Sequence, residues 1–256
     1  MTGPADGDEA SARFLRVLDD AASRSTQIAF WWRDDDAETA TPALDRLLRL
    51  ARRNKLPLAL AVIPKGADAP LAARLAEEPA VTVLQHGWQH MRHSPEGEKK
   101  MELGDHRPLA AVLDELSAGR ERLQALFPRR FLPVLVPPWN RISATVRDAR
   151  GQAGLPGLST YGPAPADAPH WINTHIDLID WTTRGPLSRS AAYALLCREV
   201  ERRRSGDREP IGLLTHHLIH QEGTWDFLEE LLDILARHPA VSWPPIADLF
   251  ALSPSR

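Results

Sequence analysis

Three consecutive carboxylates, Asp34, Asp35 and Asp36, follow a run of bulky residues at 27–33. Aromatic and β-branched side chains favour a buried strand, so the sequence predicts that these charges stand at the end of one. Like charges at the edge of a core repel one another unless a cation or a proton-transfer role compensates for them. The alternative is a solvated turn or a helix N-terminus, and the triplet alone does not decide between the two.

A histidine pair, His86 and His90, comes directly after a predicted strand at 80–84. If the segment forms a helical turn, this spacing puts both imidazoles on one face, where they could bind one metal ion. Two surface histidines are the simpler interpretation. Because the acidic triplet can supply a carboxylate, we favour a catalytic site with two histidines and one carboxylate, which leaves positions for water and substrate.

A second histidine group, His216, His217 and His220, follows a predicted strand at 211–215. A histidine near its ordinary pKa is the usual group for protonating a departing amine, and we assign this role to His216. Metal ligands and histidines packed at the rim of the core are the alternatives, because His216 and His220 also have the i, i+4 spacing. His217 and His220 are expected to be structural or to face the substrate.

Tryptophans lie beside these polar clusters, at Trp88, Trp139 and Trp181. Packing in the core is the commoner place for tryptophan, but a ring at a strand end can also form the wall of a pocket. We predict that these three residues, together with Asn140 and Arg141, contact the substrate, with the rings stacking on a sugar.

Strand-like and helix-like segments alternate along the chain. Strands are predicted at about 27–33, 58–63, 80–84, 131–136, 157–160, 171–176, 211–215 and 241–243. Helices are predicted at about 11–22, 41–51, 69–77, 108–126, 143–153, 188–203 and 224–236. Strands that are apolar throughout and alternate with helices are typical of a parallel sheet covered by helices. We therefore predict an α/β fold, a distorted (β/α) barrel of seven or eight units whose site lies at the strand ends.

The barrel is predicted to form a single domain over residues 25–252, since no internal repeat or break in composition marks a second one. Residues 1–24 are expected to form a lead and a short helix, with 1–10 flexible. The N-terminus lacks the basic and apolar regions of a signal peptide, so we expect a cytoplasmic protein. The oligomeric state is not indicated.

Composition excludes several other classes of protein. With 43% hydrophobic residues in a chain of 256, there is enough apolar surface for a full core. The net charge of −3 gives no basic stripe for nucleic acid, and no stretch reaches the length of a membrane span. The single cysteine, Cys197, excludes an internal disulfide and is expected in a core helix.

Taken in order, the clusters resemble the five motifs of the polysaccharide deacetylase superfamily, the carbohydrate esterase family 4 type with a NodB-like homology domain. The resemblance spans about residues 27–220. The matching segments are Arg33-Asp34-Asp35-Asp36-Ala37 for T-F-D-D-G, His86-Gly87-Trp88-Gln89-His90 for H-[ST]-x-x-H, Val136-Pro137-Pro138-Trp139-Asn140 for R-x-P-[FWY]-G, Asp177-Leu178-Ile179-Asp180-Trp181 for D-x-x-D-W, and Leu213-Leu214-Thr215-His216 for a leucine-rich strand ending in histidine.

The resemblance implies a metal-dependent hydrolase that removes an N- or O-acetyl group from a carbohydrate or a small amide. Zinc is the expected metal, with cobalt, nickel or manganese as alternatives. The implied roles are catalytic base for Asp35, metal ligands for Asp36, His86 and His90, acid for His216, and orienting group for Asp177. Because Asp34 and Asp35 could serve instead of Asp35 and Asp36, the frame of the triplet stays open.

The departures from the family pattern indicate a divergent branch with a different substrate. Ala37 stands where the family has a glycine, and Gly87 stands where it has a hydroxyl residue. Val136 replaces the arginine that orients the base, and His217 replaces a frequent aspartate. Arg33 or Arg141 would have to substitute for that arginine. The rival interpretation is a non-catalytic carbohydrate-binding or regulatory barrel whose site has degenerated.

Overall fold

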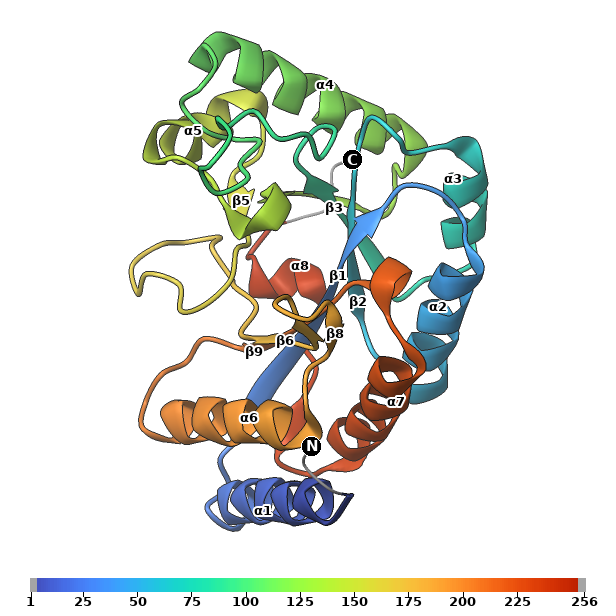
Figure 1. The fold of residues 1–256 in the computed structure, drawn as a ribbon, viewed down its shortest axis with the longest axis vertical. Coiled ribbons are helices and arrows are strands. Elements are labelled where there is room, and N and C mark those ends of the chain that lie inside the picture. Colours follow the sequence, from blue (N-terminus) through green and yellow to red (C-terminus); the bar gives the residue numbers. More distant parts are fainter. Residues whose placement is uncertain (1–3, 253–256) are drawn as a thin grey trace.

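The computed structural model describes residues 4–252 as a parallel sheet that curls around the centre of the molecule (Figure 1). Neighbouring strands follow the order β5-β4-β3-β2-β1-β9-β6, and β10 pairs with β1. The strands are β1 (Ile28–Ala37), β2 (Leu58–Val62), β3 (Val81–His86), β4 (Phe131–Val136), β5 (Gly157–Leu158), β6 (Ile176–Asp177), β9 (Ile211–Thr215) and β10 (Val241–Ser242). The predicted α/β fold with a distorted barrel is confirmed.

The distortion lies where the two edges of the sheet approach each other. Between β5 and β6, single parallel bridges join Leu158 to Trp171 and Tyr161 to Thr174. The strand predicted at 171–176 is thus reduced to isolated bridges and the two residues of β6. The preceding loop, residues 162–169, contains prolines, which cannot donate to a ladder, and it forms no strand. A short antiparallel pair, β7 (Ile179–Asp180) and β8 (Gly185–Pro186), follows β6.

Helices cover the outside of the sheet (Figure 1). They are α1 (Pro4–Ser23), α2 (Pro42–Asn54), α3 (Ala69–Ala76), α4 (Leu109–Leu126), α5 (Ala144–Ala149), α6 (Arg189–Arg204) and α7 (Glu222–Arg237). The short helix α8 (Ile246–Leu249) lies near the centre instead, and its Ile246 belongs to the same buried cluster as Trp31. Helix α2 begins as its sequence predicts, with Pro42 in the first turn and the Thr41 hydroxyl accepting from the Leu44 N–H at 3.0 Å. No helix of residues 4–252 is long and apolar enough to cross a membrane.

The N-terminal helix differs from the prediction. Residues 4–10 belong to α1, so the expected flexible lead was wrong for this part, while residues 1–3 lie outside the described chain. Phe14 and Leu18 are fully buried, and the Phe14 ring lies 5.6 Å from that of Tyr193 in α6. An apolar face that packs on α6 stabilises a longer helix than its own sequence favours.

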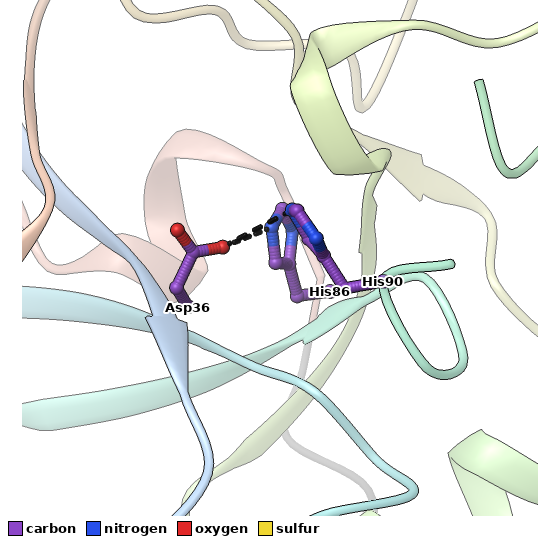
Figure 2. Close-up of side chains that lie close together, drawn as sticks. All are labelled: Asp36, His86 and His90. Carbon is purple, nitrogen blue, oxygen red and sulfur yellow. Dashed lines mark hydrogen bonds and ion pairs between the residues drawn. The ribbon is translucent and has the colours of Figure 1, made fainter. Parts of the chain in front are cut away.

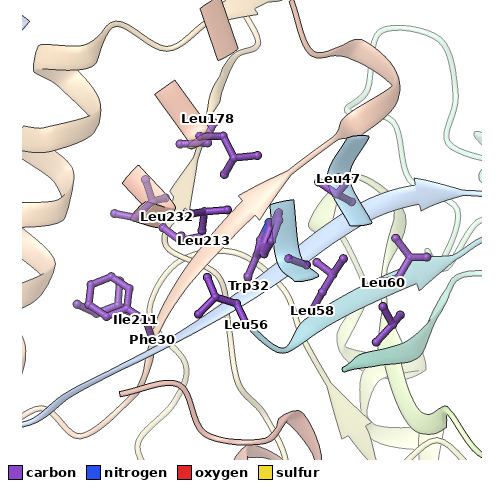
Figure 3. Packing of buried hydrophobic residues seen from close by; sticks show 14 of the residues in the cluster. Phe30, Trp32, Leu47, Leu56, Leu58, Leu60, Leu178, Ile211, Leu213 and Leu232 are labelled. Atoms are coloured by element: carbon purple, nitrogen blue, oxygen red, sulfur yellow. The ribbon is translucent and has the colours of Figure 1, made fainter. Parts of the chain in front are cut away.

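Side chains of β1 alternate between two apolar regions. Phe30 and Trp32 point outward into the layer under the helices, with Leu58 and Leu213 from the neighbouring strands (Figure 3). Trp31 points into the barrel, where its ring meets Phe250, just after α8, at 5.8 Å. Because successive strand residues face opposite sides, the same alternation determines which acidic side chain at the end of β1 faces inward.

Candidate active site

A pocket of about 340 Å³ opens at the carboxyl ends of the parallel strands. The lining residues come from the ends of β1, β3, β4, β6 and β9, the place where barrels of this type carry their sites. They are Asp35, Asp36, His86, His90, Trp139, Asn140, Arg141, Asp177, Trp181, His216 and Ile219. Two residues singled out in the sequence, Trp88 and Asp34, do not line it.

Asp36, His86 and His90 form a compact group of metal-binding side chains (Figure 2). Oδ1 of Asp36 lies 3.0 Å from Nε2 of His86 and 3.3 Å from Nε2 of His90. The three ligand atoms all lie within 4.8 Å of one another. Two ligands bound to zinc in a tetrahedral site are about 3.3 Å apart, so this group fits a divalent ion without rearrangement.

The orientation of His86 favours a ligand role. Its Nδ1 lies 2.9 Å from the carbonyl oxygen of Val136, to which it can donate a hydrogen bond. This tautomer leaves the lone pair of Nε2 directed at Asp36 and His90, as is usual for a metal-binding histidine. Since the backbone of residue 136 accepts this bond, the valine that replaces the family's arginine does not disturb it.

The segment between the two histidines is an irregular turn, so the helical turn predicted there was wrong. Gly87 and His90 both have positive φ angles, 56° and 55°. A β-carbon on Gly87 would lie 2.1 Å from Oε2 of Glu102. Only glycine therefore fits the position at which the family has a hydroxyl residue.

Glu102 lies beneath this turn and is fully buried. Its carboxylate accepts from the N–H groups of Trp88, at 3.3 Å, and Gln89, at 2.9 Å. Burial raises the pKa of Glu102, while these backbone donors favour its charged form. Glu102 could not be predicted from the sequence, because one glutamate in a loop without periodicity gives no local signal.

Asp35 is held by Arg33 through two parallel hydrogen bonds. Nε of Arg33 lies 2.8 Å from Oδ1 and Nη2 lies 3.0 Å from Oδ2, and both side chains are almost completely buried. Nη1 of Arg33 donates to Ser159 Oγ at 2.6 Å, and Nη2 donates to Asn140 Oδ1 at 2.7 Å. Of the two arginines proposed from the sequence, Arg33 takes the orienting position. Arg141 donates instead to the backbone of Lys100.

Asp34 points to the opposite side of β1, away from the pocket. It accepts from the Thr215 hydroxyl at 2.6 Å, from the His217 N–H at 3.0 Å and from Nδ1 of His217. Burial alone would raise the pKa of Asp34, but His217 and these hydrogen bonds lower it below its usual value. Asp34 thus joins the ends of β1 and β9.

Two adjacent carboxylates, Asp35 and Asp36, face the same pocket because β1 becomes irregular at its end. Its pairing with β2 shifts between Asp34 and Ala37, and Asp36 has a φ of 75°. This left-handed residue breaks the alternation that would otherwise send Asp36 outward. The geometry therefore favours the frame in which Asp35 and Asp36 are the reactive pair.

His216 reaches the pocket from the end of β9. Its Nδ1 lies 3.7 Å from Oδ1 of Asp177, too long for a hydrogen bond. Asp177 accepts instead from Nε1 of Trp181 at 2.7 Å and from the Ile179 N–H at 3.0 Å, and burial raises its pKa. The Trp181 ring meets the His216 ring edge-on at 4.9 Å, so Trp181 positions both groups.

The other two histidines of this group lie behind the pocket. His217 is buried against Asp34, which raises the pKa of His217 even though burial by itself would lower it. Nε2 of His220 accepts from the N–H of His216 at 3.3 Å. Burial, together with the nearby charges of His216 and His217, lowers the pKa of His220 to about 4. Both residues are structural in this arrangement.

Trp139, Asn140 and Arg141 form one wall of the pocket, as expected for substrate-contacting residues. The Trp139 ring lies 4.4 Å from that of His90. Trp139 and Asn140 both have a φ of 55°, and this tight turn after β4 brings Asn140 to Arg33. Trp88 is partly buried and does not line the pocket, and its substrate contact stays a prediction.

Comparison with known proteins identifies the fold. No protein family model matches the sequence, and no curated protein is significantly similar to it. Solved structures do match, at low identity. The peptidoglycan deacetylase PdaC from Bacillus subtilis is 15% identical with a TM-score of 0.54, over 87% of this chain and 90% of PdaC.

Two further structures are informative. A family 4 acetyl xylan esterase from Clostridium thermocellum, solved with a cobalt ion, is 12% identical with a TM-score of 0.56, over 87% of this chain and 90% of its own. A mutant of a CE4 family pseudoenzyme with restored enzymatic activity is 13% identical with a TM-score of 0.57, over 90% of this chain and 69% of its own. The chain therefore has the fold of the family 4 carbohydrate esterases.

Proposed function

We propose that this protein is a metal-dependent hydrolase that removes an acetyl group from an acylated amine or hydroxyl of a carbohydrate or small molecule. One observation carries the proposal. A ligand group of Asp36, His86 and His90, a carboxylate fixed by a buried arginine, and the imidazole of His216 all face one pocket. These are the parts that acyl hydrolysis requires.

Asp36, His86 and His90 would hold the metal ion. Two imidazoles and one carboxylate suit zinc first, with cobalt, nickel or manganese as alternatives. A divalent ion at this position supplies polarisation of an acyl carbonyl and acidification of water. The pocket beyond the three ligands leaves room for both water and substrate.

Asp35 acts as the general base. Arg33 occupies one acceptor site on each of its oxygens, and each oxygen keeps another for the proton of the attacking water. The fixed guanidinium prevents Asp35 from turning away from the pocket.

His216 is the acid that protonates the departing nitrogen or oxygen. Asp177 lies 3.7 Å from Nδ1 of His216 and lines the same pocket. Trp181 covers one side of the imidazole and holds Asp177. From this position the imidazole can donate a proton to the leaving group.

A non-catalytic barrel is the rival function, and a pseudoenzyme with the same fold means that the fold does not decide between the two. The pair of Arg33 and Asp35 supports an active site, because it replaces the arginine missing at Val136. The neighbours named for peptidoglycan and xylan suggest a polysaccharide, and a small acylated cytoplasmic molecule stays the alternative prediction.

Chelation tests this proposal. Acetate release from N-acetylglucosamine oligomers should stop when the metal is removed and return when zinc is added. Asp35→Asn should retain the metal but lose at least about a hundredfold in kcat, the usual contribution of general base catalysis. Asp105→Asn, at an exposed position, is the matched control. Activity that is insensitive to a chelator would contradict the proposal.

A further inference from the structure

A second groove, of about 560 Å³, opens beside the active-site pocket. The two cavities share His90, a metal-binding residue, and Trp139, which forms a wall of both. A substrate that reaches the metal-binding group can therefore extend past these two side chains into the groove.

The groove is positively charged in a protein whose net charge is −3. Lys65, Arg92 and Lys100 line it, against one carboxylate, Glu38. Lys65 donates to the side-chain oxygen of Gln89, and Nε of Arg92 donates to the Ser94 carbonyl at 2.9 Å. Within the described chain, none of the three cations forms an ion pair with a carboxylate. Their charges are therefore available to a ligand.

Lys100 connects this charge to the active site. Its Nζ lies 6.0 Å from the centre of the Trp139 ring, at the wall that separates the groove from the pocket. Its carbonyl accepts a hydrogen bond at 3.0 Å from Arg141, which lines the pocket. A negative group on a sugar seated against Trp139 would come within reach of Lys100.

We propose that this groove binds an anionic group, a carboxylate or a phosphate ester, on the same molecule whose acyl group enters the pocket. The substrate is then an acylated amino sugar that carries negative charge. Lysine and arginine bind such groups through charge-assisted hydrogen bonds, and the excess of cations over Glu38 favours an anion. This inference rests on the proposed hydrolase function and narrows its substrate class.

The test compares three substrates that differ only at carbon 6. They are N-acetylglucosamine, its 6-phosphate and N-acetylglucosaminuronic acid. The zinc-loaded protein should hydrolyse at least one anionic sugar with a kcat/KM about tenfold higher than that of the neutral sugar, the effect of one charge-assisted hydrogen bond. Added salt should reduce this preference. Comparison of the two anionic sugars shows whether the groove prefers a phosphate or a carboxylate.

The variants are Lys65→Ala with Lys100→Ala, and Lys99→Ala as the matched control. Lys99 is exposed and next to Lys100 in the chain, but it does not line the groove. The double variant should lose the preference for the anionic sugar through a higher KM, with kcat for the neutral sugar retained. Lys99→Ala should keep the preference. Equal kcat/KM values for all three sugars, or equal losses in both variants, would overturn the inference.

Calorimetric binding of N-acetylglucosamine 6-phosphate and N-acetylglucosaminuronic acid separates failure of the groove from failure of the proposed function. If none of the sugars is hydrolysed, binding of either anion that disappears in the double variant and persists in Lys99→Ala still supports the groove. If hydrolysis occurs but both variants bind the anions equally, the groove is wrong and the hydrolase function stands.

Discussion

Arg33 takes the place of the arginine that is missing from the third motif, because it holds Asp35 from the same strand. The family's orienting arginine would stand at Val136, on β4, whereas here the guanidinium comes from β1, two residues before the carboxylate that it holds. Gly87 and Glu102 form a second departure, since the carboxylate occupies the space that a β-carbon at position 87 would need. These departures keep the site intact, which argues against a degenerate barrel.

The first prediction concerns the buried ion pair. Arg33→Met leaves Asp35 charged and unpaired in the core, and it also removes the partner of Ser159. Loss of one partner of a buried ion pair costs about 3–5 kcal/mol, so urea unfolding should show a decrease in the free energy of unfolding of that size.

Arg141→Met is the control for this variant. The Arg141 side chain is only partly buried and makes one hydrogen bond, to the Lys100 carbonyl. The free energy of unfolding should therefore change by no more than about 0.5 kcal/mol. If both arginine variants unfold with the same free energy, Arg33 does not hold Asp35 in the way described.

The second prediction concerns Glu102. Glu102→Gln keeps one acceptor oxygen but turns an amide donor toward the N–H groups of Trp88 and Gln89. The turn that carries His90 then shifts, and zinc affinity should fall about 10–100-fold, as for other residues that support metal ligands. Competition with a chromogenic chelator measures the affinity.

Glu98→Gln tests whether this effect is specific. Glu98 is on the same loop, but its side chain is 57% exposed. It should leave zinc affinity unchanged. Zinc affinity that is the same in the Glu102 variant and the wild type would show that this carboxylate does not support the metal-binding turn.

At the level of elements, the contact of Asp34 with His217 joins the end of β1 to the end of β9. Asp35 follows Asp34 in β1, and His216 precedes His217 after β9. The proposed base and the proposed acid are therefore held relative to each other by a buried contact behind the pocket. In this proposal the third carboxylate of the triplet, Asp34, has a structural role.

The third prediction is a pH dependence of stability that this contact produces. Burial would lower the pKa of His217, but Asp34 raises it above 6.5. The protonated form is therefore favoured in the folded state, so the contribution is complete below pH 6.5 and disappears as the pH rises through the raised pKa. The difference in unfolding free energy between wild type and His217→Asn should shrink between about pH 6 and pH 9.

His106→Asn provides the comparison, since His106 lies at the surface beside Glu98. Urea titrations at each pH give the free energies. A difference between wild type and His217→Asn that stays constant over this range, or grows toward alkaline pH, would mean that His217 is not held protonated by Asp34.

For the whole molecule, the alternation of apolar strands and helices was enough to predict the barrel. The strands at β1 to β4 and β9 were found because their side chains are buried on both faces, which leaves an uninterrupted apolar run. The strand at 171–176 was predicted too long, because its pairing depends on how the edges of the sheet close, which no local pattern reveals. The start of α1 was missed, since residues 4–10 carry no apolar periodicity of their own.

The site could be predicted only as far as its motifs are local in sequence. Histidine spacing indicated His86 and His90, although the turn between them depends on Gly87 and is not helical. The choice of Asp35 and Asp36 over Asp34 needed the positive φ of Asp36, which no sequence pattern reveals. Contacts between distant segments, such as that of Arg33 with Ser159, become visible only in three dimensions.

Anomalous scattering at the zinc absorption edge, from crystals grown with zinc and soaked with acetate, tests the central claim most directly. One peak should lie about 2.0–2.2 Å from Nε2 of His86, Nε2 of His90 and a carboxylate oxygen of Asp36, with acetate beside it facing Asp35 and His216. A peak at any other group of side chains, or no peak in zinc-loaded crystals, would contradict the account.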